Sequence, residues 1–227
     1  MRVYSIKIDQ IFMVLFGVAI LWSMAHAFTA ESAPAFAMPV SKRIVLIDAG
    51  HGGFDPGKVS GNVLEKDINL AIALKLQGFL EEGGATVLMT RIEDKALSTD
   101  KSSDMYRRKE IANAGHVDIF ISIHQNSFGT GNVHGAQVFY YNTSDDSRRL
   151  AEHIQRELRG FVDPDNRLQA RANTNYFVLK QTAMPAVIVE CGFLSNYAEK
   201  MRLTKDEYQE RIAWGIYLGI VAFFNEK

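Results

Sequence analysis

Short apolar runs alternate with amphipathic stretches along most of the chain, and this alternation predicts strands and helices in turn. Strands are expected over six runs of apolar and β-branched residues, at 43–47, 85–89, 118–123, 136–141, 176–179 and 186–189. Helices are expected where apolar residues recur every three or four positions, at 66–82, 106–114, 144–158 and 208–224. Near-continuous apolar strands that alternate with amphipathic helices predict a single α/β domain, in which helices cover both faces of a mostly parallel, twisted sheet.

The N-terminal region has a different pattern, because it is apolar without a polar face. No charged residue occurs between Gln10 and Ala30, whereas Arg2 and Lys7 precede this run. Ala25-His26-Ala27 is a small-x-small pattern typical of signal-peptide cleavage, and about 20 apolar residues can also span a bilayer. We therefore expect an export segment over 1–30, either a signal peptide or a membrane anchor, then a linker over 31–40 and a catalytic domain over 41–227.

Composition narrows the function classes only slightly. Of 227 residues, 47% are hydrophobic and 22% are charged, as in soluble globular proteins, which excludes a disordered or polytopic membrane protein. Lys and Arg number 25 against 26 Asp and Glu, so the net charge of −1 provides no long-range attraction to nucleic acid, and no such partner is expected. Cys191 is the single cysteine, so no internal disulfide can form.

Candidate catalytic residues occur where predicted strands end. His51 follows the first strand in DAGHGG, His124 follows the third in HQN, and Glu190 follows the last in ECGF, while Glu65 opens the first long helix. Functional groups gather at the carboxyl ends of parallel strands. Two imidazoles and one carboxylate, with water in the fourth position, are a ligand set of catalytic zinc, and a second carboxylate could then act as a general base. Taken singly, each histidine could also be a hydrogen-bonded loop residue, and Glu65 could simply favour the helix dipole.

The other histidines and the cysteine have simpler interpretations. His116, His134 and His153 are expected to be solvated, although His134 lies in the loop that follows His124. Cys191 adjoins Glu190 and could be proposed as a nucleophile. Alternation along a strand directs it to the opposite face from Glu190, which favours a small buried thiol.

Six motifs in this order and spacing resemble the zinc-dependent N-acetylmuramoyl-L-alanine amidases, the amidase type 3 family. They are IVLIDAGHGGFDPG, LEKDINLAIALKL, VLMTR, RRKEIAN, DIFISIHQNS and PAVIVECGFLSN, and they extend over about 42–224. The resemblance implies that His51, Glu65 and His124 bind one Zn2+ per chain and that Glu190 is catalytic. It also implies hydrolysis of the amide bond between the lactyl group of N-acetylmuramic acid and L-alanine in peptidoglycan.

Within this family the chain is most similar to the germination-specific amidases of spore-forming bacteria. A short single domain behind an N-terminal hydrophobic segment, and GAQVFYY after the second histidine motif, carry this similarity. It implies a role in maturation of the spore cortex, through muramic lactam formation. It further implies export, a location at the cell wall or between the two forespore membranes, and an accessory protein partner in the spore envelope.

Two residues are candidates for binding the substrate. Arg171 could pair with carboxylates of the stem peptide, or be a solvated loop arginine, and Asn126 ends the HQN motif. Glycan strands and stem peptides are the expected partners, with the membrane reached only through the N-terminal segment.

Two other functions are compatible with the same residues. A zinc peptidase could use this ligand set on a peptide bond, but only an amidase leaves a free lactyl carboxylate on muramic acid. A catalytically silent wall-binding module is the other alternative, and it is disfavoured because His51, Glu65, His124 and Glu190 are all intact.

Overall fold

The computed structural model describes residues 13, 15–20, 22, 38–129 and 131–226. Contacts divide the chain into two units, Met1–Ala37 and Met38–Lys227. The described part of the first unit is helical at 15–20. No helix among the described residues is long and apolar enough to cross a membrane. The export segment predicted over 1–30 and most of the linker predicted over 31–40 lie largely outside the described residues and stay predictions.

A six-stranded sheet in the order β4-β1-β5-β8-β6-β7 forms the centre of the second unit. Its strands are β1 (Ile44–Ala49), β4 (Thr86–Met89), β5 (Ile119–Asn126), β6 (Gln137–Tyr140), β7 (Arg171–Ala172) and β8 (Ala186–Phe193). β4, β1, β5 and β8 run parallel, β6 pairs antiparallel with β8, and β7 runs parallel to β6. A separate antiparallel hairpin joins β2 (Val59–Ser60) to β3 (Val63–Leu64). The predicted mostly parallel sheet is confirmed, with one reversal at the β8–β6 boundary.

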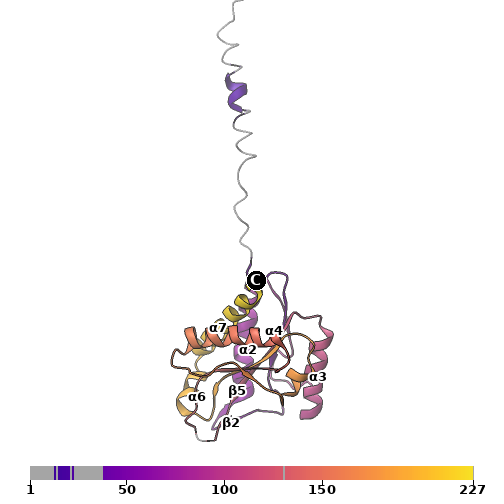
Figure 1. The fold of residues 1–227 in the computed structure, drawn as a ribbon, viewed down its shortest axis with the longest axis vertical. Coiled ribbons are helices and arrows are strands. Elements are labelled where there is room, and N and C mark those ends of the chain that lie inside the picture. The colour runs from indigo at the N-terminus through magenta and orange to yellow at the C-terminus, as the bar shows by residue number, and fades with distance from the viewer. Residues whose placement is uncertain (1–12, 14, 21, 23–37, 130, 227) are drawn as a thin grey trace, which may run out of the picture. The chain divides into compact units, whose positions relative to one another are not determined.

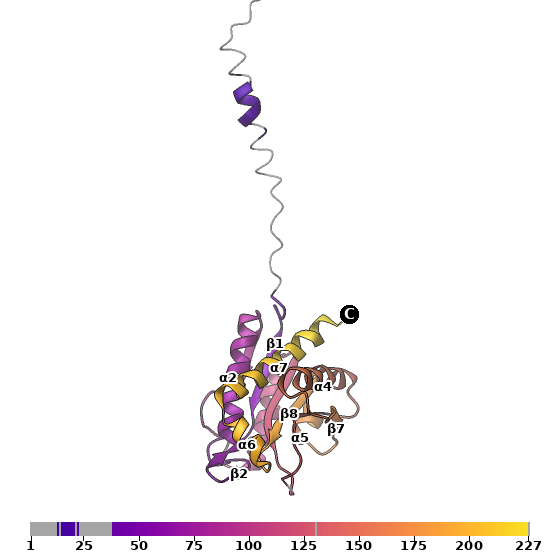
Figure 2. The same cartoon turned by 90° about the vertical axis from the view of Figure 1, so that its left-hand side faces the viewer.

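Helices cover both faces of this sheet, as the two ribbon views show (Figures 1 and 2). One face packs against α2 (Glu65–Glu82), α4 (Asp145–Glu157) and α7 (Asp206–Asn225), and the other against α3 (Lys101–Ala114) and α5 (Phe177–Gln181). A π-helical turn, η1 (Leu158–Val162), follows α4, and α6 (Tyr197–Leu203) follows β8. The predicted single α/β domain with two covered faces is thereby confirmed.

β1 illustrates why the central strands are apolar without a break. Val45 and Ile47 belong to the core on the α2, α4 and α7 side, whereas Leu46 between them belongs to the core on the α3 and α5 side. All three side chains have no exposed surface. A strand buried on both faces is apolar along most of its length, and the polar residues of β1 begin at Asp48, next to the loop that follows the strand.

Four expected elements differ clearly from the structure. The run at 176–179 was predicted as a strand but forms α5, because a short apolar run suits a buried helical turn as well as a strand. α3 begins at Lys101, five residues earlier than expected, because the Asp100 side chain caps it by accepting from Ser103 N at 3.0 Å. β5 and β8 continue past their predicted ends, so His124 and Glu190 lie inside strands.

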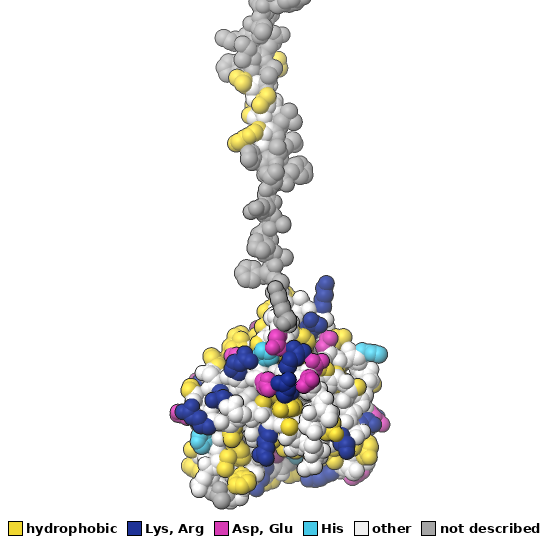
Figure 3. Space-filling view, in the orientation of Figure 1, with side chains coloured by type: hydrophobic (Ala, Val, Ile, Leu, Met, Phe, Trp, Pro, Cys, Tyr) yellow, Lys and Arg dark blue, Asp and Glu magenta, His cyan; other side chains and the backbone are white. Residues whose placement is uncertain are grey.

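The outer face of α4 has charges of both signs, which appear intermixed in the space-filling view (Figure 3). Arg149 pairs with Asp146 and with Glu226 beyond the end of α7, both at 2.8 Å. His153 was predicted to be solvated, but it is 8% exposed and its Nε2 lies 3.1 Å from Glu226. The prediction was wrong because α4 turns this position toward the C-terminal residues, which sequence periodicity does not reveal. His116 and His134 are exposed, as expected.

The described chain enters the domain at one end and leaves it nearby. Val40 N donates to Gly83 O at 3.2 Å, and the Arg43 guanidinium lies 4.6 Å from the centre of the Phe224 ring. The two ribbon views place the C-terminal end of α7 at the end of the domain opposite the β2–β3 hairpin (Figures 1 and 2). This separates Val40 and the end of α7 from the edge of the sheet where β1 and β5 terminate.

Two helical glycines give a matched test of the packing between α4 and α7. A Cβ on Gly219 would lie 2.5 Å from Ile154 Cα, whereas a Cβ on Gly78 of α2 would meet nothing within 4 Å. We expect Gly219→Ala to lower the free energy of unfolding by about 1–3 kcal/mol through overpacking. Gly78→Ala should raise it by about 0.5–1 kcal/mol through helix propensity. Urea unfolding of both variants checks this, and equal effects would contradict the close helix contact.

Candidate metal centre

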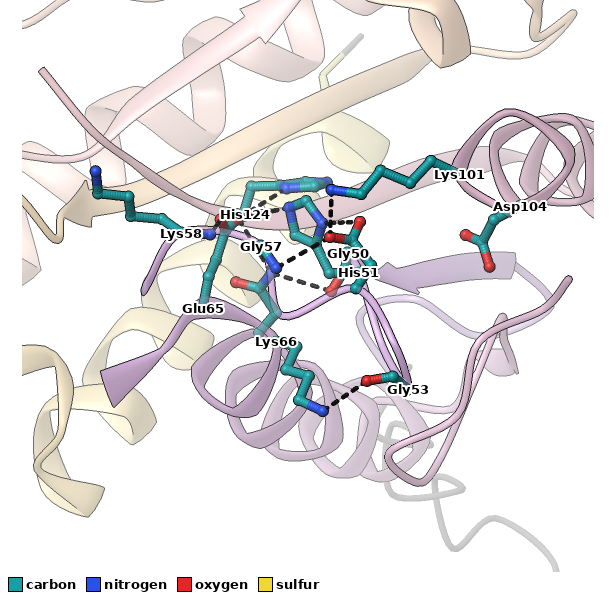
Figure 4. Close-up of polar contacts among 12 residues, drawn as sticks. Gly50, His51, Gly53, Gly57, Lys58, Glu65, Lys66, Lys101, Asp104 and His124 are labelled. Carbon is teal, nitrogen blue, oxygen red and sulfur yellow. Dashed lines mark hydrogen bonds and ion pairs between the residues drawn. The ribbon is translucent and has the colours of Figure 1, made fainter. Parts of the chain in front are cut away.

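The two histidines predicted at strand ends and the glutamate predicted at the start of the first long helix come together at one edge of the sheet (Figure 4). His51 follows β1, His124 lies near the end of the neighbouring strand β5, and Glu65 is the first residue of α2. One ligand atom from each side chain lies within 4.8 Å of the other two. This is the group among the described residues that could hold a metal ion.

His51 is held in a defined orientation. Its backbone is left-handed, with φ of 61°, and its Nδ1 lies 2.7 Å from Asp55 Oδ2. That contact leaves Nε2 directed at Glu65, 3.2 Å from Oε1. Burial would lower the pKa of His51, but hydrogen bonds and charges from Glu65 and Asp55 outweigh it and raise the pKa. Lys101 Nζ in turn lies 2.7 Å from Asp55, which fixes the carboxylate behind the imidazole.

Glu65 is 4% exposed and both of its oxygens have partners. Oε1 lies 3.0 Å from His124 Nδ1 and accepts from Gln125 N at 3.1 Å, while Oε2 accepts from Lys58 N at 2.7 Å. Burial by itself would raise the pKa of Glu65, but hydrogen bonds and charges from His124 and His51 hold it well below its usual range. The carboxylate is therefore ionised, as a metal ligand must be.

Two glycines leave room around these ligand atoms that no side chain fills. A Cβ on Gly50 would lie 2.3 Å from the His124 ring, and one on Gly57 would lie 2.6 Å from Glu65 Oε2 and from His51 Cδ2. Gly57 also has a positive φ of 66°, which favours glycine. The Gly-rich loop therefore allows the backbone to close around the three side chains.

A second carboxylate lies beside the triad without joining it. Glu190 on β8 is the register partner of His124 on β5, and it is 8% exposed. Its Oε1 lies 3.4 Å from the Tyr176 hydroxyl, and its buried Oε2 has no hydrogen-bond partner within the described residues. Burial raises the pKa of Glu190 to about 7, and the charge on Glu65 adds to this, against the opposing effect of His124. A carboxyl group with such a pKa can accept and return a proton near neutral pH.

His51, His124 and Glu190 line a cleft of about 290 Å³ between β1, α3 and α5. Lys101 and Met105 line one wall and Tyr176 and Phe177 the other. A larger hollow of about 600 Å³ beside α4 is lined by residues such as Glu152, Arg156 and Gln169, and contains none of the groups described above. Chemistry rather than size therefore identifies the functional cleft.

The two predicted substrate-binding residues are not among those that line the cleft. Arg171 is exposed on the edge strand β7, and Asn126 ends β5 with its side chain accepting from Ser127 N at 2.8 Å. Asp55 and Tyr176 were missed. Asp55 could have been recognised from the sequence, since it lies four residues after His51 in the same Gly-rich loop. Tyr176 could not, because its neighbours in the sequence do not mark it and its contact with Glu190 spans 14 positions.

Cys191 is a buried thiol, as the strand alternation predicted. It is 1% exposed and belongs to the core on the α2, α4 and α7 side, and burial raises the pKa of its thiol far above the usual range. Glu190, the preceding residue, lines the cleft instead. A cysteine nucleophile is therefore excluded.

Comparisons with a family model, with curated proteins and with solved structures all find amidases. The family model described as N-acetylmuramoyl-L-alanine amidase matches residues 45–222. The germination-specific N-acetylmuramoyl-L-alanine amidase of Bacillus subtilis is 36% identical over 205 residues, covering 87% of this chain and 86% of that protein. The CwlD amidase of Clostridioides difficile, solved in complex with the GerS lipoprotein, matches with a TM-score of 0.77 and 39% identity, covering 80% of this chain and 98% of that one. An N-acetylmuramoyl-L-alanine amidase of Clostridium difficile 630 matches at 0.74 and 33% identity, covering 82% and 98%.

Proposed function

This chain belongs to the N-acetylmuramoyl-L-alanine amidase family, and on that premise we propose that His51, Glu65 and His124 bind one zinc ion and that Glu190 is the catalytic base. The chain is an amidase that acts on peptidoglycan. The bond cleaved joins the lactyl carbonyl of N-acetylmuramic acid to the nitrogen of L-alanine. The observation that supports the site assignment is the convergence of three ligand atoms within 4.8 Å, beside a buried carboxylate oxygen that has no hydrogen-bond partner in the described part of the chain.

The donor set fits zinc. Two imidazole nitrogens and one carboxylate oxygen suit a borderline ion, and three protein ligands leave a position open for water or substrate, as in catalytic zinc sites. The contact from Asp55 to His51 Nδ1 is the type of outer contact that fixes the tautomer of a metal-binding histidine. Gly50 and Gly57 provide space that a Cβ would fill.

Bound zinc would act as a Lewis acid that polarises the carbonyl and lowers the pKa of a coordinated water to about 7. Glu190 Oε2, which has no other partner among the described residues, accepts the proton of the attacking water. Tyr176 holds Oε1 from the other side of the carboxyl group. Glu190 then delivers this proton to the nitrogen of L-alanine, which leaves as a neutral amine rather than as an anion. The products are a lactyl carboxylate and a free stem peptide.

Elemental analysis of the full chain, together with mass spectrometry of digested peptidoglycan, tests this proposal. We expect about one zinc per chain and muramic acid with a free lactyl carboxylate. Cleavage between amino acids of the stem would instead identify a peptidase with the same ligands. Intact peptidoglycan after incubation with stoichiometrically loaded protein would contradict the assigned reaction.

The biological setting follows from the relatives. Similarity to a germination-specific amidase supports a role in maturation of the spore cortex, where removal of the peptide precedes muramic lactam formation. The relative solved with a lipoprotein supports an accessory protein partner in the spore envelope. Such a role requires export across the cytoplasmic membrane, which the apolar run near the N-terminus supports. Deletion of the gene should remove muramic lactam from the cortex of the source organism's spores, and its persistence would contradict this role.

Removing the Tyr176 hydroxyl should change the pH dependence of catalysis. The hydroxyl donates to Glu190 and lowers the pKa of that carboxyl group, opposing the effect of burial. In Tyr176→Phe the pKa should rise, so the active carboxylate is lost at a higher pH as the solution is acidified. We expect the acid limb of the kcat/KM profile to move to higher pH. Tyr106→Phe, whose ring packs on Phe177 at 4.9 Å, is the control and should leave the limb in place.

A further inference from the structure

Two buried arginines lie behind the loop that carries His51, and neither is part of the proposed ligand set. Arg91 lies just beyond β4 and Arg108 lies in α3, and each is 5% exposed. They belong to the motifs VLMTR and RRKEIAN, in which no residue binds the metal or transfers the proton in the proposed reaction. Burying a guanidinium is costly unless its N–H groups find acceptors, so the acceptors indicate what each arginine does.

Arg91 joins the segments that carry two of the proposed ligands. Its Nε donates to Ala49 O at 2.8 Å, and its Nη2 donates to Gly50 O at 3.0 Å. The same Nη2 donates to Lys66 O at 2.8 Å. Gly50 precedes His51, and Lys66 follows Glu65 at the start of α2. One planar group therefore connects the backbone beside His51 to the backbone beside Glu65.

Arg108 holds the same loop from α3. Its Nη1 donates to Ala49 O at 3.0 Å and its Nη2 to His51 O at 2.8 Å. Asp104 accepts from Nε at 2.7 Å, and the buried Asp48 accepts from Nη1. These two carboxylates compensate the buried charge and leave the guanidinium fixed in place.

The backbone of this loop needs such support. Three consecutive carbonyl groups, those of Ala49, Gly50 and His51, accept from the two arginines. His51 adopts a left-handed φ of 61°, a conformation that side chains with a Cβ disfavour. His51 lies between the end of β1 and the start of α2, where neither a strand nor a helix fixes the backbone. Its imidazole nevertheless lies 3.2 Å from Glu65, so other contacts must hold the backbone in this conformation.

We propose that Arg91 and Arg108 are positioning residues that hold His51 at metal-binding distance from Glu65, so that the affinity for zinc depends on their forked hydrogen bonds. The proposal rests on the metal centre assigned above. Neither arginine is a metal ligand in this role. They act through the backbone carbonyls on each side of the ligands, and Arg91 is the connection between the two ligand-bearing segments.

Lysine substitutions distinguish the effect of the forked hydrogen bonds from the effect of the positive charge. A lysine at either position keeps the positive charge but cannot donate in one plane to several carbonyl groups. Zn2+ affinity is measured in the full chain by competition with a chromophoric chelator. We expect Arg91→Lys and Arg108→Lys to bind Zn2+ about 10- to 100-fold more weakly, as when an outer contact of a metal ligand is lost. Arg211→Lys is the matched control, because Arg211 Nη2 also donates to two consecutive carbonyls, Phe161 O and Val162 O, away from the site. It should change the affinity less than twofold.

A second measurement is independent of zinc. Hydrogen exchange of the metal-free protein, resolved by peptide, should become faster over 49–57 in the Arg91 and Arg108 variants and stay unchanged there in Arg211→Lys. Gly50 N, which donates to Ile123 O at 3.1 Å, is a reporter within this segment. If the wild-type chain binds no Zn2+, the metal assignment fails, and the exchange result still decides whether the arginines hold the loop.

Four results would overturn the proposal. One is wild-type affinity in whichever lysine variant folds. Another is loss of affinity in Arg211→Lys equal to that in Arg91→Lys. A third is lowered stability in metal-free urea unfolding with unchanged affinity and unchanged exchange over 49–57. The last is failure of both lysine variants to fold, which would assign the arginines to folding of the whole domain.

Discussion

Glu190→Gln should bind zinc with wild-type affinity and lower kcat by about 10²- to 10⁴-fold, the usual contribution of a general acid–base group. The amide has nearly the same shape as the carboxyl group and can keep the contact with the Tyr176 hydroxyl. It cannot take a proton from water or return one to the leaving nitrogen. Zinc content of the purified variant tests the expected metal binding, and kcat on purified muropeptides tests the expected loss of turnover.

Glu199→Gln is the matched control for this substitution. Glu199 is also a buried glutamate, 1% exposed, but its two oxygens accept from Gly135 N at 2.9 Å and Phe193 N at 2.8 Å. An amide would place an N–H group against one of these donors, so we expect a loss of about 1–3 kcal/mol in the free energy of unfolding. Turnover per folded molecule should change little. Activity retained by Glu190→Gln would remove Glu190 from the role of catalytic base.

The second large effect is expected at a ligand. His124→Ala removes one of three proposed donors, and the affinity for Zn2+ should fall by more than about 100-fold, beyond the loss typical of an outer contact. Purified protein should then contain far less than one zinc per chain and show no measurable amidase turnover. Elemental analysis and chelator competition measure the loss.

His153→Ala is the control, because it also removes a buried imidazole. Its Nε2 lies 3.1 Å from Glu226 on the α4 side of the domain, away from the cleft. Zinc content and activity should stay at wild-type levels in this variant. Stoichiometric zinc in His124→Ala would contradict the assignment of His124 as a ligand.

Much of the fold could be predicted because two buried faces impose a distinct pattern on each strand. β1 and β8 each begin with four apolar residues in a row, and α2 and α7 read as helical repeats that end at glycines or near the end of the sequence. α5 could not be recognised, since five residues are too few to show a period, and packing against the α3-side core decides its conformation. The early start of α3 depends on a side-chain cap, and the burial of His153 depends on a contact with residues 73 positions away.

The sequence by itself determined the α/β class and the family, and it predicts His51, Glu65, His124 and Glu190 as the reactive set, because these are patterns of residue type and spacing. Tertiary structure alone decided which groups surround them. Asp55 behind His51, Tyr176 on Glu190, and the forks of Arg91 and Arg108 on the His51 loop all depend on which way side chains turn once the strands are aligned. Hydrogen bonds of this kind join residues up to 59 positions apart, and nothing in local composition specifies their partners.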